Sequence, residues 1–145
     1  MSKTANDWRP QASVETLEKR SAIVWQLRQL FHRHGYAEVH TPTISRDTVI
    51  DRYIDPIEID GAALACPQAN SQRYFLQTSP EFCMKRLLAA GMKAIYQFCP
   101  AYRAGERGQF HNPEFTMLEW YRADEPFEQA IHFLATLTES VLSKH

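Results

Sequence analysis

The sequence predicts an α+β fold, in which helices flank an antiparallel sheet. One observation behind this prediction is a pair of extended segments, 94–102 and 114–121, joined by a polar turn that contains two glycines. The others are two runs of apolar residues at helical spacing, one within 17–31 and one within 127–142. A hairpin between amphipathic helices is typical of this class.

The remaining elements follow along the chain. The first helix is expected to end near Gly35, because glycine is frequent just beyond a helix C-terminus. Residues 36–40 then indicate a short strand, and 1–15 a flexible lead-in to a single domain over 16–145. The other predicted elements are a strand within 51–59, an exposed loop at 61–72, a strand at 73–77 and a helix at 80–90.

The second arm of the hairpin carries a carboxylate among apolar residues. Because side chains alternate along a strand, Phe115, Met117, Glu119 and Tyr121 share one face. Burying a charge is costly unless it is paired. We therefore expect Glu119 to meet a cationic group.

The turn adds groups that suit a nucleotide. Arg103 ends the first arm, and a guanidinium matches phosphate oxygens bidentately. Glu106, His111 and Asn112 supply hydrogen-bonding groups, and Phe115 offers a flat face for a purine. Each of these residues alone would fit an ordinary surface hairpin. Together with the carboxylate they predict a site for ATP and an amino acid.

The segment from His111 to Tyr121, HNPEFTMLEWY, resembles motif 2 of the class II aminoacyl-tRNA synthetases of the lysyl type. The resemblance implies that Arg103 is the catalytic arginine, which bridges the substrate carboxylate and the α-phosphate. The lysyl pattern has a glutamate two residues after this arginine, where Gly105 stands here, so we expect Glu106 to contact the adenine amino group instead. The ATP-binding residues that the resemblance implies are Arg103, Glu106, His111, Asn112 and Phe115.

A second segment, 78–81, reads T-S-P-E, which the family also has. An acid in a first helical turn is favourable in its own right, and this would explain Glu81 without any ligand. The resemblance implies instead that Ser79 and Glu81 line the amino-acid pocket. It also implies that Glu119 and Tyr121 hold the lysine side chain. Two carboxylates suit a substrate with two ammonium groups.

The stretch from Leu17 to Pro42 resembles motif 1 of the family, a long helix and a strand that ends in proline. Taken alone, such a helix and strand are generic, and core packing would explain them. In the family this element forms the homodimer interface. The resemblance therefore implies a homodimer through this helix and strand.

Motif 1 begins here within the first twenty residues, so we do not expect before it the anticodon-binding β-barrel of true lysyl-tRNA synthetases. This layout resembles a truncated branch of the family, which activates (R)-β-lysine with ATP and transfers it to a lysine side chain of elongation factor P. The segments 8–13, 51–57 and 84–88 agree less specifically. The expected partners are lysine or β-lysine and elongation factor P, and tRNA is not expected. Both lysines would place two ammonium groups near the same carboxylates.

Class II catalytic domains also need motif 3, with a second arginine for ATP and acidic residues that hold Mg²⁺. The sequence ends at His145 without such an element. We therefore expect 16–145 to be the N-terminal part of a catalytic domain. The Mg²⁺ ligands are then expected in the missing half, with no metal site in this chain. Two alternatives stay open: a fragment of a lysyl-tRNA ligase, and a catalytically inactive module that dimerises.

Composition is consistent with this assignment. The net charge is −1, from 16 basic and 17 acidic residues, so a general basic footprint for nucleic acid is absent. Three widely spaced cysteines argue for a reducing cytosol, and their spacing does not match a metal site. Cys83 and Cys99 are predicted to be core residues and Cys66 a loop residue. With neither a transmembrane run nor a signal peptide in the sequence, we expect a cytoplasmic protein without membrane association.

Overall fold

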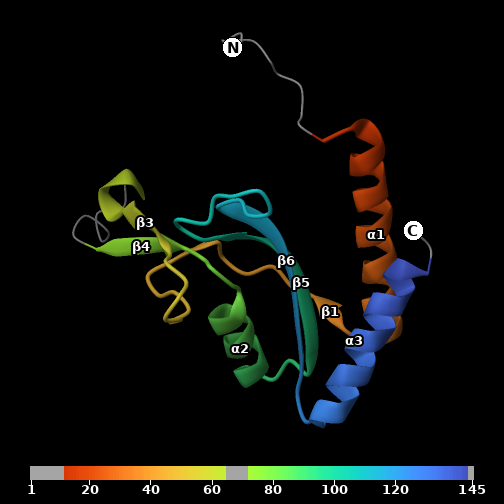
Figure 1. Ribbon diagram of the computed structural model, residues 1–145. Helices are drawn as coiled ribbons and strands as arrows, with labels where there is room; N and C mark the ends of the chain where they lie inside the picture. The colour runs from red at the N-terminus through yellow and green to blue at the C-terminus, as the bar shows by residue number, and fades with distance from the viewer. Residues whose placement is uncertain (1–11, 65–71, 144–145) are drawn as a thin grey trace. The chain divides into compact units, whose positions relative to one another are not determined.

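The computed structural model describes residues 12–64 and 72–143 (Figure 1). Three predicted features lie wholly or mostly outside the described residues: the flexible lead-in, Cys66 and the 61–72 loop. The chain divides into two compact units. One comprises Met1–His34 with Glu125–His145, and the other is Gly35–Asp124.

The first unit is a pair of helices, α1 (Val14–Arg33) and α3 (Phe127–Leu142), which pack on each other (Figure 1). Ser13 begins α1, because its Oγ accepts a hydrogen bond from the Thr16 N–H at 3.2 Å. Phe31 and Phe133 meet edge to face in the core of this unit, with ring centroids 5.2 Å apart. Both long helices predicted from the apolar spacing are confirmed.

The second unit is built around the hairpin of β5 (Ala94–Tyr102) and β6 (Glu114–Arg122), the longest strands in Figure 1. The short strand β1 (Ala37–Glu38) pairs with β5 in parallel, so this sheet is mixed. A second sheet has the order β2 (Ile44–Ser45), β4 (Arg73–Leu76) and β3 (Ile57–Asp60), all antiparallel. The unit also contains η1 (Gly61–Leu64) and α2 (Glu81–Ala89).

The short strands differ from the expected ones. Of the strand expected within 51–59, only the last part forms, as the start of β3. The chain turns before it, because the Asp51 side chain accepts a hydrogen bond from the Tyr53 N–H at 3.0 Å. The strand expected at 36–40 shrinks to β1. The strand β2 was missed, since two residues are too few to show an alternating pattern.

Gln77 joins the two sheets of this unit through its main chain. Its N–H donates to the Thr43 carbonyl, and its carbonyl accepts from the Tyr102 N–H, both at 2.9 Å. The Gln77 side chain also donates to the Pro100 carbonyl at 3.1 Å. These bonds hold the end of β4, and with it the start of α2, beside the end of β5.

Part of the core of the second unit lies on one face of the hairpin. Ile95, Cys99 and Ala101 of β5 are buried on this face, and Met84 of α2 is buried in the same unit. Burial raises the pKa of the Cys99 thiol to about 11; a hydrogen bond with Gln97 lowers it and the charge of Glu119 raises it further. The core position expected for Cys99 is confirmed, whereas Cys83 is only half-buried.

Candidate active site

The strand register brings the predicted residues of the second arm onto one face. Glu119 lies opposite Gln97, and Phe115 lies opposite Ala101. Directly opposite residues in an antiparallel pair project from the same side of the sheet. Phe115 and Glu119 therefore share the face whose β5 residues are buried, as the alternation predicted. Phe115 lies near the turn, and Glu119 lies farther along the strand.

Glu119 is the centre of a hydrogen-bonded cluster. The Ser79 hydroxyl donates to Glu119 Oε2 at 2.7 Å, and the Tyr121 hydroxyl donates to Oε1 at 2.5 Å. The Ser79 oxygen also accepts the Glu81 N–H at 3.1 Å, which connects the cluster to the start of α2. The bonded partners of Glu119 in this cluster are thus neutral hydroxyls, where a cation was expected. Its negative charge stays uncompensated by them, and a ligand ammonium group would fit it.

Tyr121 is set up to remain a hydrogen-bond donor. Burial raises the pKa of its hydroxyl, and the hydrogen bond to Glu119 and the charges of Glu119 and Glu81 raise it further. The phenol therefore keeps its proton throughout the physiological range. It can orient the carboxylate without adding a second negative charge.

Glu81 lies in the first turn of α2, close enough to Tyr121 for its charge to act on that hydroxyl. Its carboxylate pairs with Lys85 Nζ, one helical turn on, at 2.5 Å. Because the Lys85 side chain is largely exposed, this pair contributes little to stability. The ammonium group of a ligand could replace Lys85 at small cost.

A cavity of about 220 Å³ lies at the other end of the hairpin face. Its lining residues are Arg103, Glu106, Phe110, His111, Asn112 and Phe115. The five residues predicted to bind ATP are thus all brought together around one space. The sixth, Phe110, was missed by sequence reasoning, although a large aromatic in a polar turn was a signal.

Arg103 is held at the mouth of the turn with part of its hydrogen-bonding capacity unused. Its guanidinium carbon lies 5.0 Å from the centre of the Phe115 ring, and its Nη1 lies 3.7 Å from Glu106 Oε1. Its Nε is buried and has no hydrogen-bond partner within the described parts of the chain. Buried donors are nearly always paired in folded proteins. A ligand oxygen would satisfy this one.

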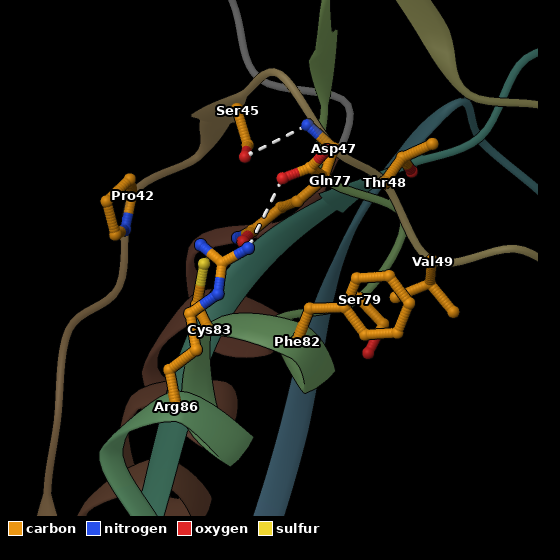
Figure 2. A pocket seen from close by; sticks show the side chains of 10 residues that line it. All are labelled: Pro42, Ser45, Asp47, Thr48, Val49, Gln77, Ser79, Phe82, Cys83 and Arg86. Carbon is orange, nitrogen blue, oxygen red and sulfur yellow. Dashed lines mark hydrogen bonds and ion pairs between the residues drawn. The ribbon is translucent and has the colours of Figure 1, made fainter. Parts of the chain in front are cut away.

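A second hollow lies beside Ser79, between the segment after β2 and α2 (Figure 2). At about 10 Å³ it has room for a single water molecule. Arg86 Nη2 pairs with Asp47 Oδ2 across it at 3.3 Å. The hollow is too small for an amino acid. The Arg86–Asp47 pair links the segment after β2 to α2, the helix that follows Ser79.

Within the described ranges, no group of three or more histidine, cysteine or acidic side chains is placed to hold a metal ion. No chemical step is assigned to a metal here. Among the same residues, no helix is both long and apolar enough to cross a membrane.

The mixed sheet, the arginine-bearing hairpin and the carboxylate cluster at a helix start define the class of this protein. The family described as tRNA synthetases class II (D, K and N) matches residues 1–145, and the chain belongs to this family. Its α+β fold is that of part of a class II catalytic domain.

Among individual proteins, the chain is similar to the elongation factor P–(R)-β-lysine ligases of several bacteria. It is 42% identical to that of Salmonella arizonae over 98% of this chain and 43% of the relative. It is 42% identical to that of Vibrio vulnificus over 94% of this chain and 42% of the relative. For Erwinia tasmaniensis the identity is 44%, over 98% and 43%. The chain thus spans less than half the length of these relatives.

Proposed function

We propose that the protein containing this chain activates (R)-β-lysine or lysine with ATP and transfers it to a lysine side chain of elongation factor P. The observation that carries the proposal is Arg103. It is a largely buried cation whose Nε has no partner among the residues that the structure describes, and it lines a cavity with the other predicted ATP residues. The names of the similar proteins support the choice of substrate and acceptor.

In the first step, a carboxylate oxygen of the substrate attacks the α-phosphorus of ATP. The bond from this phosphorus to pyrophosphate breaks, and an aminoacyl adenylate forms. Arg103 stabilises the charge that develops at the phosphorus, and its Nε, which has no partner in the described part of the chain, is available for this. The adenine stacks on Phe115 and hydrogen-bonds near Glu106, His111 and Asn112.

The Glu119 cluster holds the amino acid during this step. One substrate ammonium group binds Glu119, oriented by Ser79 and Tyr121, and the second is assigned to Glu81. In the second step, the acceptor amine attacks the adenylate carbonyl, an amide forms, the amine loses a proton and AMP leaves. Because positioning supplies much of the rate, a covalent enzyme intermediate is not needed.

The proposal includes a cytoplasmic homodimer. The first unit presents Val14, Leu17 and Trp25 of α1 to solvent, and these residues lie on the motif 1 helix. Two copies would bury this surface together. The balanced charge of the chain supports elongation factor P rather than tRNA as the acceptor.

Arg103→Ala in the full-length protein tests the first step. We expect the rate of lysine-dependent ATP–pyrophosphate exchange to fall about 10²- to 10³-fold, the usual cost of one transition-state donor. The far-ultraviolet circular dichroism should be unchanged. Arg73→Ala, an exposed arginine on β4 that pairs with Glu58, is the matched control and should exchange normally. Exchange retained by Arg103→Ala would rule out its assigned role.

The acceptor is tested with purified elongation factor P and with lysine tRNA, each incubated with the enzyme, ATP and labelled lysine or β-lysine. Label on elongation factor P alone supports the proposal. Label on the tRNA alone would overturn it in favour of a tRNA ligase. Failure of the full-length protein to form any adenylate would favour an inactive module.

A further inference from the structure

The candidate nucleotide cavity contains a second aromatic ring, that of Phe110, for which neither the motif nor the fold gives a role. Phe110 is 87% exposed, and it lines the same cavity as Phe115. A single exposed apolar residue is common on protein surfaces. Here, however, the exposed ring lies at a cavity that already contains a half-buried ring and a guanidinium.

The backbone of the turn explains how Phe110 is presented. The Arg103 N–H donates to the Pro113 carbonyl at 2.9 Å, which closes the base of the turn. The Gly108 N–H donates to the His111 carbonyl at 3.0 Å. Residues 109 and 110 therefore form a tip that is fixed at both sides, and Phe110 projects from this tip.

Phe115 alone offers limited surface to a base. The Arg103 guanidinium lies over its ring, so one ring face is already covered by a cation. A purine that enters the cavity must therefore stack on the remaining surface of Phe115 or displace the Arg103 guanidinium. Displacement is unfavourable, because Arg103 is the residue proposed to bind the phosphate. Among the described lining residues, Phe110 provides a second phenylalanine ring, and this ring is exposed.

The size of the cavity agrees with a single planar ligand. Pockets for drug-sized ligands usually measure about 300–1,000 Å³. At about 220 Å³ this cavity is smaller, which suits one base rather than a whole nucleotide. A flat aromatic base would gain contact from a ring on a second side, and the Phe110 ring would lose its exposure to water.

We propose that Phe110 is a base-binding residue for ATP, which packs its ring on the adenine. This inference rests on the proposed function, because it assumes that ATP binds in this cavity. It assigns Phe110 to the base and leaves the phosphates to Arg103. Affinity for adenine-containing ligands should therefore depend on Phe110, and affinity for bare polyphosphate should not.

The test is calorimetric titration of the full-length protein with ATP and with inorganic tripolyphosphate. Phe110→Ala should weaken ATP binding by about 5- to 150-fold, the range for losing one base–aromatic stack. It should leave tripolyphosphate binding within twofold of the wild type. Phe110→Trp should restore ATP binding, because it replaces the flat surface. The matched control is Phe127→Ala, a similarly exposed phenylalanine at the start of α3, outside the cavity.

Three results would overturn the inference. ATP affinity unchanged in Phe110→Ala would show that the ring does not contact the base. An equal loss of ATP and tripolyphosphate affinity, or no rescue by Phe110→Trp, would indicate a general disturbance of the turn. Absence of ATP binding by the wild type would refute the proposed function itself, which separates the two failures.

Discussion

Glu119 shows how a single carboxylate can be oriented without a protein cation. Ser79 and Tyr121 each donate a hydrogen bond to one of its oxygens. The sequence predicted that Glu119 would meet a cation, whereas its bonded partners in this cluster are neutral hydroxyls, and the sequence could not identify Ser79 as one of them. Ser79 and Glu119 are 40 positions apart, and their contact depends on how α2 packs against the hairpin. Local patterns indicate what a residue needs and do not show which distant residue supplies it.

At the residue scale, Glu119→Gln is expected to impair lysine binding specifically. The amide keeps the shape and loses the charge that would face the substrate ammonium. Breaking a desolvated charge pair costs about 2–5 kcal/mol, so the KM for lysine in ATP–pyrophosphate exchange should rise at least about 30-fold. The KM for ATP should change little.

Tyr121→Phe is the matched variant for this prediction, because it removes one neutral hydrogen bond and keeps the charge. We expect a smaller rise in the KM for lysine, of about fivefold, which corresponds to ~1 kcal/mol. A larger effect for Tyr121→Phe than for Glu119→Gln would show that the hydroxyl, rather than the carboxylate, binds the substrate.

At the scale of elements, long helices were predicted well from the sequence, and very short strands were not. The helix α3 has the bounds expected from its apolar spacing, and α1 begins three residues before the expected Leu17. The short strands β1 and β2 have two residues each and exist because β5 and β4 offer them partners. Such strands form because a distant strand pairs with them, and a local alternation of apolar and polar residues does not reveal this pairing.

The end of α1 gives the prediction at this scale. Gly35 follows the helix with φ of +75°, a conformation that costs other residues energy because of their Cβ. Gly35→Ala should reduce the free energy of unfolding by about 1–2 kcal/mol. Urea denaturation followed by circular dichroism measures this change.

Gly35→Asn is the control, because asparagine tolerates the left-handed region better than alanine does. It should lose less stability than Gly35→Ala. The space around Gly35 is open, so a steric clash is not expected from either side chain. Equal losses in both variants would argue that the backbone conformation is not the cause.

At the scale of the whole molecule, exposed apolar residues on α1 support the proposed homodimer. Trp25 has 62% of its surface exposed, and it lies on the helix that resembles motif 1. Tryptophans at the centre of an interface often contribute 2 kcal/mol or more to binding. This surface is where we propose that two copies meet.

Trp25→Glu in the full-length protein is therefore expected to weaken dimerisation by about 30-fold or more. Analytical ultracentrifugation over a range of concentrations measures the dissociation constant. Ile50→Glu, which changes a residue of 90% exposure outside motif 1, should leave it unchanged. A wild-type protein that sediments as a monomer at all concentrations would contradict the proposed dimer.

The main-chain bonds of Gln77 have a consequence for substrate selection. Gln77 is two residues before Ser79, and its carbonyl binds the N–H of Tyr102, the neighbour of Arg103. These main-chain bonds therefore fix the spacing between the groups that we propose to bind the substrate ammonium and the phosphate, before either ligand arrives. Replacement of the side chain at 77 or 102 by any residue other than proline would keep the main-chain groups that form those bonds. A diamino acid whose chain is too short or too long to span this fixed spacing would therefore bind poorly in the proposed site.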